Sequence, residues 1–105
     1  MLQFKDKIKK VVIEEGVTTI GSDAFSSCYN LNEVVISDSV TSIGGFAFRN
    51  CNSLTSATIG NSGRTINEDT FYSCDSLTSV TIPDGVTTIN DSTFYNCINL
   101  RNILI

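Results

Sequence analysis

Histidine is absent from this chain of 105 residues, and basic side chains are few: seven lysines and arginines stand against eleven aspartates and glutamates, for a net charge of −4. Without an imidazole, a thiolate nucleophile has no partner base, and only scattered carboxylates remain for acid–base chemistry. An acidic chain also lacks the basic face that phosphate binding needs. We therefore expect neither an enzyme nor a nucleic-acid-binding protein.

Long apolar runs are missing too. No stretch reaches the roughly 18 consecutive apolar residues of a membrane-spanning helix, and residues 1–7 lack the apolar stretch of a secretory signal. We expect no insertion into a membrane and no signal peptide in this chain. With 41% hydrophobic residues, a chain of this length can form one domain with a modest core.

What the chain does contain is an internal repeat of 23 residues. Each repeat has a cysteine, a phenylalanine three residues before it and a leucine three residues after it: Cys28, Cys51, Cys74 and Cys97; Phe25, Phe48, Phe71 and Phe94; Leu31, Leu54, Leu77 and Leu100. The apolar residues of one coil cannot offset the conformational entropy of its backbone, which costs about 1–2 kcal/mol per residue. Neighbouring coils must therefore stack, as in a solenoid.

Each coil predicts two extended segments joined by turns. Segments such as Glu33–Ile36 and Ser79–Ile82 carry alternating β-branched residues, which predicts five short strands in one parallel sheet. The segment Val40–Ile43 looks extended as well. The next position holds only residues that best tolerate φ > 0, which predicts a turn there: Gly21, Gly44, Asn67 and Asn90. The residues that follow, such as 22–27, suit a single α or 3₁₀ turn.

The chain is therefore expected to be a single α/β solenoid over residues 1–105. A partial coil takes residues 1–30, complete coils take residues 31–53, 54–76 and 77–99, and a terminal strand takes residues 100–105. We see no polar capping repeat at the C-terminal end, where Leu104 and Ile105 stand. This predicts either a fragment of a longer array or self-association through the exposed coil.

The residues of one coil carry a family resemblance. Residues 77–89 read LTSVTIPDGVTTI and are followed by Phe94-Tyr95-Asn96-Cys97, which resembles the BspA-like class of leucine-rich repeat; the match covers about residues 8–105. The resemblance implies a right-handed superhelix with one parallel sheet, used as a protein-interaction module in cell-surface or secreted proteins that act in adhesion. It implies no catalytic or cofactor residue. The chain departs from the pattern at Gly63-Arg64, and at Asn67 and Asn90 in place of glycine.

The even spacing of the cysteines bears on their chemistry. It matches no zinc pattern of paired C-x₂-C ligands, so a metal site is not expected. Disulfides between neighbouring coils are a rival, because a rise of about 5 Å per coil suits the Cα separation of a bridge. Parallel side chains would, however, hold the Cβ atoms about 5 Å apart, whereas a bridge needs roughly 3.5–4.5 Å. We favour buried free thiols that pack as small hydrophobic groups.

Columns of the repeat form two candidate interaction surfaces. On the outer side of the predicted sheet, Glu33, Val35, Thr58 and Thr81 belong to ladders that either bind a ligand or are ordinary sheet-surface residues. Just after the core phenylalanine stand Arg49, Tyr72 and Tyr95, residue types that are enriched at interface hot spots. These three could equally form a structural stack of aromatic rings with a cation at its end.

Two functions follow from these columns. In the first, the chain is a non-enzymatic interaction module of a cell-surface or secreted protein and binds a protein or other macromolecule. In the second, it is a structural spacer or a self-associating repeat protein with no ligand of its own. A cytoplasmic location is the alternative to the cell surface, and no cofactor is expected.

Overall fold

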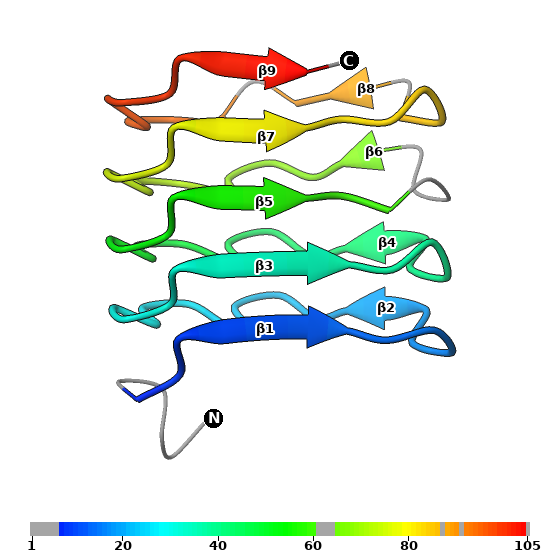
Figure 1. The fold of residues 1–105 in the computed structure, drawn as a ribbon. Helices are drawn as coiled ribbons and strands as arrows, with labels where there is room; N and C mark the ends of the chain where they lie inside the picture. The colour runs from blue at the N-terminus through cyan, green and yellow to red at the C-terminus, as the bar shows by residue number, and fades with distance from the viewer. Residues whose placement is uncertain (1–6, 61–64, 87, 91, 105) are drawn as a thin grey trace.

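A computed structural model describes residues 7–60, 65–86, 88–90 and 92–104 of the chain. In these residues nine short strands follow one another along the chain: β1 Lys10–Ile13, β2 Thr19–Ile20, β3 Glu33–Ile36, β4 Ser42–Ile43, β5 Ser56–Thr58, β6 Thr65–Ile66, β7 Ser79–Thr81, β8 Thr88–Ile89 and β9 Asn102–Leu104. The odd-numbered strands form one layer and the even-numbered strands lie behind it (Figure 1). The predicted solenoid is confirmed. Gly63-Arg64 and Ile105 lie outside the described residues.

The main sheet has five parallel strands in the order β1-β3-β5-β7-β9. Each residue pairs with the residue one repeat later, for example Val11 with Val34 and Ala57 with Val80. Behind it, β2 pairs with β4 and β6 with β8, again in parallel. The 23-residue spacing of the sequence is thus the register of both layers, and columns of the repeat become ladders along the solenoid.

The core lies between these two layers. Val34, Ala57 and Val80 point inward from the main sheet and are buried, while the phenylalanines of the repeat close the other side. The four rings form one continuous stack, with centroids 5.5, 5.5 and 5.7 Å apart and planes within 10° of parallel. Offset stacks of this kind add about 0.5–1.5 kcal/mol per pair to the area that they bury. Each coil is therefore stabilised by the coils above and below it.

The prediction of a single α or 3₁₀ turn after each even-numbered strand is wrong. The described residues contain no helix. Alternate backbone N–H groups of these segments donate to the next coil instead: Phe25 to the carbonyl of Ala47 at 2.8 Å and Ser27 to that of Arg49 at 2.7 Å. Because these donors point along the solenoid axis, they cannot close the bonds of an α-helix within one coil.

The predicted site of positive φ is also wrong. Left-handed residues lie two positions later in three coils, at Asp23, Phe46 and Asp69, and six positions later in all four, at Ser27, Asn50, Ser73 and Asn96. Gly44 is needed for another reason, since a Cβ atom there would collide with the backbone of Ser22 in the preceding coil. At the equivalent place in the next coil, the Nδ2 of Asn67 donates to the carbonyl of Ile43 at 2.6 Å. This column therefore serves the contact between coils.

Candidate interaction surfaces

The outer side of the main sheet, here called the sheet face, carries two ladders. The register aligns Lys10, Glu33, Ser56, Ser79 and Asn102 in one ladder, and Val12, Val35, Thr58, Thr81 and Leu104 in the other. Thr58 and Thr81 are exposed, and Glu33 and Val35 are half-buried. The Nζ of Lys10 lies 3.6 Å from the Oε1 of Glu33, which is a solvent-exposed ion pair. The sheet face thus offers hydroxyls, valines and few free charges.

A second surface lies on the turns that follow β4, β6 and β8. The rings of Tyr72 and Tyr95 stack at 4.8 Å with an interplanar angle of 18°. The guanidinium carbon of Arg49 lies 4.9 Å from the centre of the Phe46 ring, and this ring meets Tyr72 edge-on at 5.8 Å. The structure therefore brings the three sequence-predicted residues together, but the cation rests on Phe46 rather than on a tyrosine. We call Phe46, Arg49, Tyr72 and Tyr95 the aromatic strip.

Phe46 is the member of the aromatic strip that sequence reasoning missed. Its φ is 59°, in the left-handed region, where the equivalent residues are Asp23 and Asp69. Aspartate tolerates this conformation, whereas a bulky side chain there is an outlier that costs of order 1–2 kcal/mol. The available signal was the break in the column, which has phenylalanine where the other coils have aspartate or serine.

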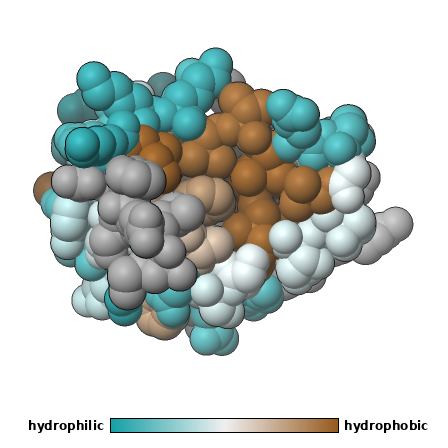
Figure 2. Space-filling model, turned by 90° about the horizontal axis from the view of Figure 1, so that it is seen from below, coloured by the Kyte–Doolittle hydropathy of each residue, from teal (hydrophilic) through white to brown (hydrophobic). Residues whose placement is uncertain are grey.

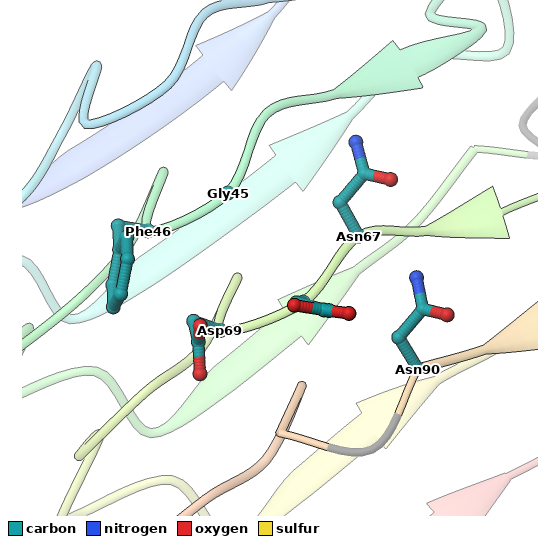
Figure 3. A pocket seen from close by; sticks show the side chains of 6 residues that line it. Gly45, Phe46, Asn67, Asp69 and Asn90 are labelled. Atoms are coloured by element: carbon teal, nitrogen blue, oxygen red, sulfur yellow. The ribbon is translucent and has the colours of Figure 1, made fainter.

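An open depression of about 330 Å³ adjoins the aromatic strip at Phe46 (Figure 3); it is lined by Gly45, Phe46, Asn67, Glu68, Asp69 and Asn90. Asn67 and Asn90 lie on consecutive coils in the same orientation. Their Nδ2 atoms donate to the carbonyls of Ile43 and Ile66, at 2.6 and 3.1 Å. The charged groups of the lining are both carboxylates, those of Glu68 and Asp69.

The cysteine column faces the core. Cys28, Cys51 and Cys74 are buried and Cys97 is half-buried, and all four are free thiols, as the sequence favoured. The Sγ of Cys51 donates to the carbonyl of Phe25 at 3.2 Å, and Cys74 and Cys97 repeat this bond one and two coils later. Burial raises the pKa of Cys51 to about 12. A thiol held neutral in this way is a poor nucleophile.

Metal-ligand clusters and membrane spans are not found in the described part of the chain. It contains no group of three or more cysteine, aspartate or glutamate side chains placed to hold an ion. None of its segments forms a helix long and apolar enough to cross a membrane.

The two ends of the solenoid expose residues that inner coils bury. Val17 in the first coil is 41% exposed, while its equivalent Val40 is 2% exposed. Ile103 in the last strand is 43% exposed, while Val80 is fully buried. Seen along the axis from the β1 end, apolar side chains gather in the middle of the surface, with hydrophilic groups at its rim (Figure 2). In inner coils the equivalents of Val17 and Ile103 are buried by the neighbouring coils.

Comparison with known proteins agrees with this architecture. The sequence pattern of one family, described as a BspA-type leucine-rich repeat region of six copies, matches residues 2–105. Among curated proteins, none matches the chain with statistical significance.

Several solved bacterial structures are similar to the chain. A leucine-rich cell surface protein from Faecalibacterium prausnitzii is 34% identical over 90% of the chain, with a TM-score of 0.65. A leucine-rich repeat protein from Bacteroides ovatus is 33% identical over 93%, with a TM-score of 0.85, and the leucine-rich repeat protein of T. pallidum is 27% identical over 92%, with a TM-score of 0.68. The chain spans 31%, 25% and 58% of the lengths of these three proteins.

Proposed function

Since this chain belongs to the family of BspA-type leucine-rich repeat proteins, we propose that it is a non-enzymatic protein-interaction module and that it binds a protein partner through the aromatic strip. The observation that carries the proposal is the aromatic strip itself. It presents two stacked tyrosines, a phenylalanine and an arginine on adjacent coils, beside a depression. Tyrosine and arginine are among the residues that most often dominate the free energy of binding at protein interfaces.

The exposure of the aromatic strip supports this role. Tyr95 is 55% exposed, although its stacked partner Tyr72 is half-buried. The stack with Tyr72 restricts the ring of Tyr95, so little side-chain entropy remains to be lost when a partner covers it. Arg49 is held by Phe46 and by Asp23, whose Oδ1 lies 4.0 Å from the guanidinium. The aromatic strip is thus preorganised for contact.

We further propose that the module acts at the cell surface, where it adheres to partner macromolecules. The support is the resemblance to the cell surface protein of Faecalibacterium prausnitzii, which is 34% identical over 90% of the chain. The net charge of −4 suits protein partners better than nucleic acid.

A protein array tests the proposed function. The labelled chain is applied to immobilised extracellular and bacterial surface proteins, alongside a double variant Arg49→Ala/Tyr95→Ala and a sheet-face variant Thr58→Lys/Thr81→Lys. We expect saturable binding to at least one protein, weakened at least about tenfold, or 1.4 kcal/mol, by the first variant and unchanged by the second. Loss of binding only in the sheet-face variant would move the site to the sheet face.

The sheet face is the second candidate because its ladder of Val12, Val35, Thr58 and Thr81 includes a valine that is 52% exposed. The other alternative is a spacer without a ligand that self-associates through its ends, where Val17 and Ile103 are exposed. Sedimentation of the isolated chain over a wide concentration range tests this alternative. A monomer at every concentration, together with binding on the array, would remove it.

A further inference from the structure

We propose that the depression beside the aromatic strip receives a basic side chain, lysine or arginine, of the partner polypeptide. This inference rests on the proposed function and deepens it, because it states what chemistry the partner must present. Three features of the depression carry it: the amide oxygens of its wall, the aromatic ring at its edge, and its two carboxylates.

The amides are the first feature. Asn67 and Asn90 stand one coil apart on the wall, in the same orientation (Figure 3). Each Nδ2 is engaged with a backbone carbonyl of the preceding coil, that of Ile43 or of Ile66. Each of these bonds uses one N–H of the amide, and the amide oxygen can only accept a hydrogen bond. An ammonium or guanidinium group, which only donates hydrogen bonds, can therefore be accepted by the two oxygens.

Phe46 is the second feature. The fold holds this residue in the left-handed region, at a φ of 59°, as it holds Asp23 and Asp69 at the equivalent positions of two other coils. The ring lies at the junction of the depression and the aromatic strip, where it can cover the methylene groups of a long basic side chain while the charged end reaches the polar wall.

Charge is the third feature. Glu68 is exposed and Asp69 is half-buried, and neither forms an ion pair with a described lysine or arginine. The cation nearby, Arg49, rests on the Phe46 ring and faces Asp23. Among the described residues, no lysine or arginine therefore pairs with these two carboxylates. At a volume of about 330 Å³ it has room for one long side chain and several waters, since a water occupies about 30 Å³.

The test is an NMR titration that needs no identified partner. The ¹⁵N-labelled chain is titrated with N-acetyl-lysine methylamide and N-acetyl-arginine methylamide, and with the norleucine analogue as a neutral probe of similar length. We expect saturable shifts at Gly45, Phe46, Glu68 and Asp69 with the two basic probes, with a Kd in the range of about 1–10 mM for a single side chain. The norleucine probe is expected to be at least fivefold weaker.

Two matched variants decide whether the carboxylates are responsible. Glu68→Gln/Asp69→Asn removes both charges, and asparagine keeps the left-handed conformation of residue 69. Glu14→Gln/Glu15→Gln removes two adjacent exposed charges elsewhere. We expect the first pair to weaken binding of both basic probes at least tenfold and the second to leave it within twofold.

The inference is overturned by shifts that do not saturate, by equal shifts with norleucine, or by equal losses in the two variants. The array experiment on the proposed function is separate. Protein binding without specific binding of the basic probes would overturn this inference alone. Specific binding of the basic probes without any protein binding would contradict the proposed function and leave the depression as a cation-accepting site.

Discussion

Replacement of Gly44 by alanine tests the claim that close contact between coils shapes the turns. A Cβ atom at Gly44 would lie 2.8 Å from both the carbonyl carbon of Gly21 and the Cα of Ser22. Those are backbone atoms, so no side chain can rotate away and the two coils must separate. Separation of the coils would also strain the hydrogen bond from the N–H of Gly44 to the carbonyl of Ile20, which is 2.8 Å long. Overpacking of this kind costs about 1–3 kcal/mol.

Gly21 provides the matched control because it occupies the same column and a Cβ there would meet nothing within 4 Å. Gly21→Ala is expected to be neutral or to stabilise by up to about 1 kcal/mol through the unfolded chain. With a urea m-value of about 1–3 kcal/mol/M, the midpoint of Gly44→Ala should lie about 1 M below that of Gly21→Ala. Equal midpoints for the two variants would refute the reasoning.

Three further predictions concern stability. Phe71→Ala removes a fully buried ring that stacks on both neighbours, and should lower the free energy of unfolding by about 3–5 kcal/mol in the same urea assay; a loss below 1 kcal/mol would contradict the stack. Phe46→Asn relieves the strain of a left-handed phenylalanine but removes the contacts of its ring with Arg49 and Tyr72. Because these two effects are of similar size, the free energy of unfolding should stay within about 1 kcal/mol of wild type. A loss as large as that of Phe71→Ala would show that the strain was overstated. Burial raises the pKa of the Cys51 thiol from 9.0 to about 12; its contribution to stability is therefore complete below pH 9 and declines as the pH rises toward 12, so Cys51→Ala should flatten the fall in stability measured over that range.

Much of the fold follows from one periodicity. Once Cys28 and its equivalents set a period of 23 residues, stacking of identical coils makes Val34 the neighbour of Val11 and of Ala57. Alternation along the strand then separates the buried Val34 from Val35, which faces outward. Sequence could therefore supply both the register and the composition of the sheet face.

The turns could not be predicted in the same way. The direction of a backbone N–H depends on φ and ψ values that many residues permit. Here alternate N–H groups donate to the adjacent coil, and the groups between them donate within their own coil. The prediction of a positive φ at Gly44 therefore failed. Glycine is needed there because the backbone of the preceding coil lies too close for a Cβ atom. The sequence offered, as one of two interpretations, a stack of tyrosine rings with Arg49 at its end; the ring that Arg49 meets is instead that of Phe46, a left-handed residue.

The most direct test of the central claim is hydroxyl-radical footprinting of the chain with and without a partner found on the array. Oxidation of Tyr95, which is 55% exposed, and of its stacked neighbour Tyr72 reports on the aromatic strip, while Val12, which is 52% exposed, reports on the sheet face. Our account predicts that the partner protects both tyrosines and leaves the oxidation of Val12 unchanged. Protection of Val12 with unchanged tyrosines would contradict it.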